Sequence, residues 1–258
     1  MKIASSPALL VLPALPAAAQ VSYVSGLYHE DFSALQNAAI FASYSAMPAG
    51  WSHTNGGSPY YYYTNGGQGV TNNTRAYSFS SSPGATDKGF GFWFSANTTG
   101  TEGYFGVALR NDSTLTYSEL GVNYQAAQWA KGAVTAQNQG VYFQYALGAS
   151  GIGASGFTAA SAFDLSSIHD GDGVYSALDG DAPENRIIIG GTLSGFTWQP
   201  GQILWLRWRF PNYNGSTADH AMAIHDFSFA AIPEPASFAA TLGLLGLGLA
   251  GNRRPRRR

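Results

Sequence analysis

The chain between Gln20 and Ala231 is a series of short β-rich runs separated by glycine, proline and asparagine. Runs of this length with alternating apolar and polar residues are typical of half-buried β-strands. Apolar residues do not keep a 3.6-residue period over three turns, although residues 31–43 leave room for one short helix or an irregular crossing. We therefore expect an all-β, antiparallel sandwich with nine strands, at residues 26–32, 75–79, 89–94, 104–110, 115–124, 141–146, 186–189, 203–210 and 221–229.

The run at residues 203–210 predicts its own orientation. Its even positions carry the apolar side chains Leu204, Leu206, Trp208 and Phe210. Arg207 and Arg209 fall at odd positions, and successive side chains of a strand point to opposite faces. We expect a central strand that buries one face and turns its arginines to the other.

Size, cysteine content and charge limit the possible functions of this part. About 210 residues suffice for one sandwich or barrel with a sizeable core. The chain has no cysteine, so disulfides, thiolate metal sites and cysteine nucleophiles are excluded. Without Lys2 and five C-terminal arginines 7 of the 13 basic residues remain, and without Glu234 14 of the 15 acidic residues, a net charge of about −7. This charge argues against a nucleic-acid partner.

The last 27 residues differ in kind from the rest. The tripeptide Pro233-Glu234-Pro235 is followed by an uncharged span at residues 236–251 and then by five arginines, Arg253, Arg254, Arg256, Arg257 and Arg258. As a helix the span would reach about 24 Å, close to the roughly 30 Å hydrocarbon core of a bilayer. The positive-inside bias would keep the arginines cytoplasmic and place the globular part outside. A disordered Gly/Leu tail is the alternative.

The N-terminus has the features of a secretory signal peptide. Lys2 precedes an apolar run at residues 8–18, and Ala17-Ala18-Ala19 supplies the small residues of a cleavage site. We predict cleavage after Ala19. The chain then divides into a signal peptide at residues 1–19, a β-sandwich at 20–231 and a sorting tail at 232–258.

The order of tripeptide, apolar span and arginine cluster resembles the PEP-CTERM signal of bacterial exported proteins. The resemblance implies that an exosortase-like membrane peptidase recognises Pro233, Glu234 and Pro235, and that the five arginines stop translocation. It also implies export by the Sec machinery, cleavage by signal peptidase and transient residence in the inner membrane of a Gram-negative bacterium. The processed protein would reach the cell surface or the extracellular matrix.

Several short segments resemble an extracellular jelly-roll domain often found before PEP-CTERM tails, whose wider relatives are laminin-G-like, MAM-like and carbohydrate-binding sandwiches. They are Glu30-Asp31-Phe32, Pro48-Ala49-Gly50-Trp51, Tyr77-Ser78-Phe79, Leu204-Trp205-Leu206-Arg207-Trp208 and the closing run from Asp219 to Phe227. Such domains commonly close on an Ala-Ile-Asp-Asp-Phe-like strand. This chain has His225 in place of the first aspartate and keeps Asp226.

There are two candidate binding features, a calcium site that the resemblance implies and a sugar-stacking surface that the aromatic residues suggest. A structural calcium ion would join Glu30 to Asp226 with backbone carbonyls completing six to eight oxygens, although His225 removes one possible ligand. We expect no other cofactor. Sugar rings would stack on Trp51 or on the tyrosine run Tyr60, Tyr61, Tyr62 and Tyr63. Strand alternation would instead bury two of these tyrosines and expose two, which is a purely structural role.

Catalytic patterns are weak. The acidic loops at residues 170–173 and 179–181 fit solvated turns, since they lack the full calcium-loop spacing. The sequence contains neither His-Glu-x-x-His nor Gly-x-Ser-x-Gly, and Glu102, Glu119 and Glu184 are scattered. We therefore expect an exported surface protein without catalytic activity. The alternative is a carbohydrate-binding module for extracellular polysaccharide, and a hydrolase would need paired carboxylates.

Overall fold

A computed structural model of the chain describes residues 20–35, 47–54, 60–63, 75–82, 85–94, 102–135, 138–213 and 218–234, with the backbone alone for residues 60–63 and 75. The structural statements below concern these residues. The predicted signal peptide, residues 36–43 of the possible short helix and the tail from Pro235 onward lie outside them. Residues 31–35 form an irregular turn.

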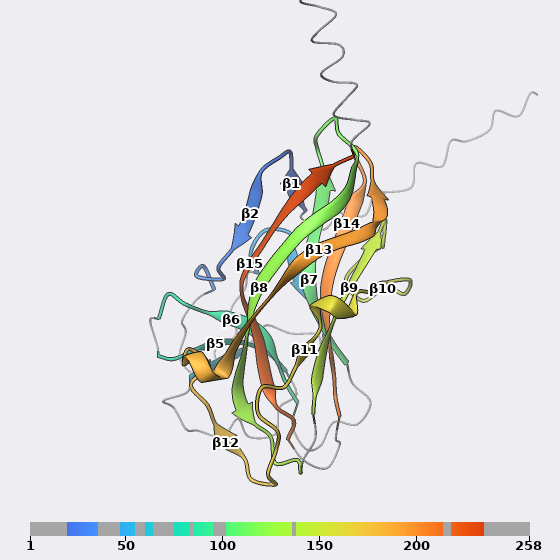
Figure 1. Cartoon of the computed structure of the whole chain (residues 1–258). Helices are drawn as coiled ribbons and strands as arrows, with labels where there is room; N and C mark the ends of the chain where they lie inside the picture. Colours follow the sequence, from blue (N-terminus) through green and yellow to red (C-terminus); the bar gives the residue numbers. More distant parts are fainter. Residues whose placement is uncertain are drawn as a thin grey trace, which may run out of the picture.

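The described residues form two β-sheets (Figure 1). The seven-stranded sheet contains β1 (Val21–Tyr23), β3 (Trp51–His53), β7 (Glu102–Asn111), β9 (Gly140–Leu147), β10 (Thr158–Ala159), β11 (Leu165–Ser166) and β14 (Ile203–Pro211). The eight-stranded sheet contains β2 (Leu27–Glu30), β4 (Tyr60–Tyr63), β5 (Arg75–Ser80), β6 (Gly89–Trp93), β8 (Tyr117–Lys131), β12 (Ser176–Ala177), β13 (Arg186–Trp198) and β15 (Ala221–Pro233). Two short 3-10 helices, η2 (Ser161–Phe163) and η3 (Pro183–Asn185), join strands.

All nine predicted strands are present, as β2, β5, β6, β7, β8, β9, β13, β14 and β15. The strands β8, β13 and β15 extend beyond their predicted ends. Their continuations contain glycine and alanine and do not alternate strongly, so the sequence pattern does not indicate them. The sheets are mostly antiparallel, with parallel pairs of β1 with β7 and of β4 with β5. The six other strands, β1, β3, β4, β10, β11 and β12, were not among those predicted, and each has only two to four residues.

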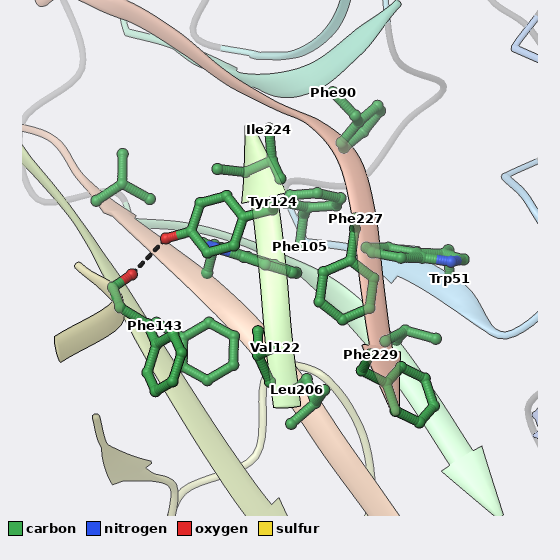
Figure 2. Packing of buried hydrophobic residues seen from close by; sticks show 14 of the residues in the cluster. Trp51, Phe90, Phe105, Val122, Tyr124, Phe143, Leu206, Ile224, Phe227 and Phe229 are labelled. Carbon is green, nitrogen blue, oxygen red and sulfur yellow. Dashed lines mark hydrogen bonds between the residues drawn. The ribbon is translucent and has the colours of Figure 1, made fainter. Parts of the chain in front are cut away.

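The main core lies between the two sheets (Figure 2). The strand β14 pairs with β7 on one side and β9 on the other, so the predicted central position is confirmed. Its side chains Leu204, Leu206, Trp208 and Phe210 lie in this core, as predicted. Large aromatic rings bury most apolar area per residue, so these contacts dominate the packing. The hydroxyl of Tyr124 donates a hydrogen bond to the carbonyl oxygen of Phe163 and so attaches η2 to the core.

A second hydrophobic cluster covers part of the outer face of the eight-stranded sheet. It contains Tyr77, Phe79, Trp93, Ala127, Trp129, Ala130, Ala221 and Ala223, with Tyr175 packed against it. The rings of Trp93 and Tyr175 stack with centroids 5.4 Å apart. A Cβ atom at Gly180 would lie 2.3 Å from the indole of Trp129, so glycine is required where this loop crosses the ring. The segment before β13 is therefore attached to the sheet by packing.

The outer face of the seven-stranded sheet is also covered in part, and this corrects the simple expectation for Arg207. Its side chain leaves the core face as predicted, yet Arg207 is only 6% exposed. The guanidinium lies 4.2 Å from the ring centroid of Tyr104 and 3.5 Å from that of Phe157. It donates to the carbonyl oxygens of Ile152 and Ala154 at 2.7 and 3.0 Å. Cation–π contacts and hydrogen bonds thus hold the loop at residues 148–157, which contains four glycines, over the sheet.

Candidate functional site

The end of β15 brings the predicted sorting tripeptide to the folded domain. Ile232 pairs with Glu119 and Pro233 pairs with Tyr117 on β8. The backbone N–H of Glu234 donates to the carbonyl oxygen of Thr116 at 3.1 Å. The last strand therefore continues past the predicted boundary at residue 231. A proline is tolerated here because the end of a strand has few ladder hydrogen bonds to lose.

Tyr23 on β1 supports this strand end from the other sheet. Its hydroxyl accepts a hydrogen bond from the backbone N–H of Ala231 at 2.9 Å and donates to the carbonyl oxygen of Gly26 at 2.8 Å. The ring of Tyr23 stacks on Trp198 with centroids 5.6 Å apart. The strand end is thus fixed by its pairing with β8 and by a buried tyrosine.

The rest of the predicted tail, comprising Pro235, the apolar span and the arginine cluster, lies outside the described residues. Within the described part of the chain, no helical segment has the length and apolar character needed to cross a bilayer.

A polar cluster on the outer face of the eight-stranded sheet was not predicted. Asp87, Asp181 and His225 bring potential ligand atoms within 4.8 Å of one another. Arg186 at the start of β13 pairs with both carboxylates, with its Nη2 atom 2.8 Å from Asp87 Oδ2. His225 is fully buried, and its Nδ1 atom lies 3.1 Å from Asp87 Oδ1.

The hydrogen bonds of His225 determine whether its ring nitrogens are free to bind a metal ion. The indole N–H of Trp129 donates to Nε2 of His225 at 3.3 Å, so the proton of a neutral ring lies on Nδ1 and is donated to Asp87. This hydrogen bond, above all, lowers the pKa of Asp87 to about 2. Both ring nitrogens are engaged and Arg186 supplies the compensating positive charge. The cluster fits an arginine rather than a metal ion.

Glu30 and Asp226, the residues predicted to bind calcium, are engaged by groups of the protein. Glu30 accepts a hydrogen bond from the N–H of Phe32 at 2.9 Å, and burial raises the pKa of Glu30. Asp226 accepts from the amide of Gln125 at 2.8 Å, and its Oδ1 atom lies 3.7 Å from Nε2 of His29. Its φ of 45° falls where the pairing of β15 with β8 shifts register.

Lys88 supplies a positive charge to the turn at residues 31–35, where it interacts with Asp31. Its ammonium group, buried at 5% exposure, donates to the carbonyl oxygen of Ser33 at 2.8 Å and to that of Leu35. These backbone oxygens lie three and five residues after Glu30 and are the kind that calcium would need. Because a lysine already uses them, the described residues do not fit a calcium ion joining Glu30 to Asp226.

The structure describes the side chain of Trp51 but not those of the tyrosine run, the two candidates for sugar stacking. Trp51 is 5% exposed, and its ring packs against other core aromatics, including Phe105 at 5.2 Å and Trp208 at 6.0 Å between centroids. Its indole N–H donates to the hydroxyl of Tyr28 at 2.9 Å. A ring buried in this way presents no face to a ligand, which removes Trp51 as a platform. Tyr60, Tyr61, Tyr62 and Tyr63 form β4, and their side chains lie outside the described part.

Partly exposed aromatic and charged side chains meet instead on the outer face of the seven-stranded sheet. Arg209 Nε donates to Glu102 Oε1 at 2.9 Å, and its guanidinium lies 5.7 Å from the ring centroid of Tyr142. The hydroxyls of Tyr142 and Tyr213 are 2.9 Å apart. Tyr104 completes this group by a hydrogen bond to Glu102. We call these five residues the tyrosine–arginine face.

The comparisons with known proteins support the reading of the tail. Residues 231–258 match the family model described as PEP-CTERM protein-sorting motif. The motif indicates exosortase-dependent sorting of a surface protein, with export and processing at a membrane. No curated protein matches the chain.

A structural likeness to the crystal structure of the Agl-KA catalytic domain covers 86% of this chain and 30% of that one, at 10% identity and a TM-score of 0.27. The chain thus spans under a third of that structure.

Proposed function

We propose that this chain is an exported β-sandwich without catalytic activity of its own, sorted through its C-terminal tail and displayed at the cell surface or in the extracellular matrix. The observation that carries the proposal is the match at residues 231–258, which begins inside the last strand of the folded body. The sorting signal therefore delivers the sandwich itself. The jelly-roll assignment rests on the sequence resemblance.

In this proposal each end of the chain has its own processing step. Sec export is followed by signal-peptidase cleavage after Ala19. The span at residues 236–251 then enters the inner membrane of a Gram-negative cell, with the arginine cluster on the cytoplasmic side. An exosortase-like peptidase reads Pro233, Glu234 and Pro235 and separates the sandwich from the span.

The test replaces the tripeptide in the producing bacterium. The Pro233→Ala/Glu234→Ala/Pro235→Ala variant should accumulate as a larger, membrane-associated form on an immunoblot. The chain offers a matched control, because Pro183 and Glu184 form a second, exposed Pro-Glu pair in η3. Pro183→Ala/Glu184→Ala should be processed normally. Normal processing of the tripeptide variant would contradict the proposal.

Binding of extracellular polysaccharide is the second candidate function. It is favoured by the tyrosine–arginine face, where partly exposed tyrosine rings adjoin the Arg209–Glu102 ion pair, whose side chains are 34% and 35% exposed. Tyrosine faces take the apolar side of a sugar ring and the charged pair takes hydroxyls. On a glycan array, Tyr142→Ala should lose saturable binding while Tyr142→Phe keeps it. A wild-type protein that binds no glycan would remove this candidate.

A further inference from the structure

The strand β13 forms a long, open edge of the eight-stranded sheet. Among the described strands β13 pairs with β8 alone, in nine consecutive residue pairs from Arg186 to Ser194 without a register shift. Ile187 is 47% exposed and Ile188 is 70% exposed. Gly190, Gly191, Thr192 and Ser194 are exposed as well. The edge therefore offers both backbone groups and apolar side chains to solvent.

This edge lacks the features that usually prevent strands from pairing between molecules. Proteins protect sheet edges with lysine, proline, bulges or very short strands. Residues 187–194 contain neither a charge nor a proline, and the irregularity in the pairing comes only after Ser194. By contrast, β10 at the edge of the seven-stranded sheet has two residues.

A groove of about 670 Å³ keeps the first half of the edge open. Its walls are residues 186–190 of β13 and residues 162 and 164–168, which include β11. Ile187 and Ile189 line one side and Leu165 and Ile168 the other. A strand added to β13 would thus find room for apolar side chains beside the backbone edge.

We propose that β13 pairs in antiparallel fashion with β13 of a second copy of this chain. Residues 188–194 of this uncharged stretch can face the same residues of the second copy, because a two-fold axis normal to the sheet would pair Gly191 with Gly191 of that copy and oppose no like charges. The exported domain otherwise carries about −7 and so repels a second copy. Charge thus selects this neutral edge as the place where two copies meet.

The pairing fixes where the two tails lie. Pro233 pairs with Tyr117, and Tyr117 pairs with Trp198, so β13 and β15 end at the same end of the sheet (Figure 1). In an antiparallel pair the two copies of Pro233 lie at opposite ends of the joined sheet. Two copies whose tails are inserted in the same membrane cannot adopt this arrangement. This inference rests on the proposed function. Two copies pair either after their release from the membrane or when they are displayed on two opposing surfaces.

The first test measures the mass of the processed protein, recovered from outside the producing cells, by sedimentation equilibrium. The mass should rise from monomer to dimer between about 1 and 100 µM, the range of modest interfaces. Ile188→Lys should raise the dissociation constant at least tenfold, since an edge lysine is a natural block. Val174→Lys, at a residue 66% exposed outside this edge, is the matched control and should not change it.

Cysteine cross-linking tests the register, because the chain has no cysteine of its own. Gly191→Cys, where a Cβ would lie 3.7 Å from Phe163, should give a disulfide-linked dimer. Ser194→Cys should not, since the two copies of residue 194 would lie about 20 Å apart.

Three results would overturn the inference: a monomer at 100 µM, equal effects of Ile188→Lys and Val174→Lys, or equal cross-linking at positions 191 and 194. Unprocessed protein on an immunoblot would count against the proposed function instead. Unchanged thermal melts of the variants establish that they fold.

Discussion

The backbone N–H of Glu234 donates a hydrogen bond to the carbonyl oxygen of Thr116, at 3.1 Å. The central residue of the sorting tripeptide is therefore attached to the turn that leads into the long β8. Ala231, where the family match begins, is hydrogen-bonded to Tyr23 of the other sheet. Peptidases act on extended segments that have left the folded structure. Processing at this motif consequently competes with the pairing of β15.

A disulfide that locks the strand end should slow processing. Ile232 and Glu119 are directly paired, and paired residues of antiparallel strands have the Cα separation that a disulfide needs. Ile232→Cys/Glu119→Cys should be processed about tenfold more slowly when oxidised and normally when reduced, measured by pulse-chase. Asn123→Cys/Ser228→Cys, a paired control further along β15, should be processed normally in both states. Equal rates for the two locks would mean that the strand end need not detach.

Removal of the Trp51 side chain should destabilise the sandwich rather than a ligand complex. Trp51 packs against both Phe105 and Trp208 in the main core. Truncation of a large buried aromatic leaves a cavity and costs about 3–5 kcal/mol. Urea denaturation of Trp51→Ala should show a loss in this range, with a smaller loss for Trp51→Phe. A loss below about 1 kcal/mol would contradict the buried position.

The ion pairs of Asp87 should stabilise the fold in a pH-dependent way. The hydrogen bond from His225, together with Arg186, lowers the pKa of Asp87 to about 2. The stabilising contribution is therefore complete above the ordinary carboxyl pKa of about 3.9 and is lost as the pH falls through about 2. Because Asp87 is half-exposed, we expect Asp87→Asn to cost only about 1 kcal/mol at pH 7. The difference from the wild type should shrink as the pH falls below about 4 and vanish below about 2 in urea denaturation, and exposed Asp170→Asn should show no such trend. A difference as large at pH 2 as at pH 7 would contradict this account.

Calcium should not stabilise the protein. The carbonyl oxygens after Glu30 accept hydrogen bonds from Lys88, and the carboxylate of Asp226 accepts one from Gln125. Millimolar Ca²⁺ should leave the midpoint of thermal unfolding unchanged within about 1 °C, and a chelator should have no effect. Lys88→Met should lower this midpoint in both conditions. A rise with calcium in the wild type would show that Lys88 can be displaced.

Local patterns made most of the fold predictable. The alternation in β14 gave its buried face correctly, because successive side chains of a strand point to opposite sides whatever the rest of the molecule does. The tripeptide, apolar span and arginines are likewise contiguous in the sequence, so the sorting motif could be found without a structure. The length of β13 could not be predicted from the sequence, because glycines interrupt the β-rich pattern. The strand continues past them because it pairs with β8.

The sequence by itself determined that this chain is a β-sandwich body with a sorting tail, since both depend on the order and spacing of neighbouring residues. Only the tertiary structure decided which distant residues meet. It buried Trp51, placed Arg186 between Asp87 and Asp181, put Lys88 on the carbonyl oxygens after Glu30 and left β13 at an open edge. These contacts join segments far apart in the chain, and they depend on strand register and sheet order, which no local pattern specifies.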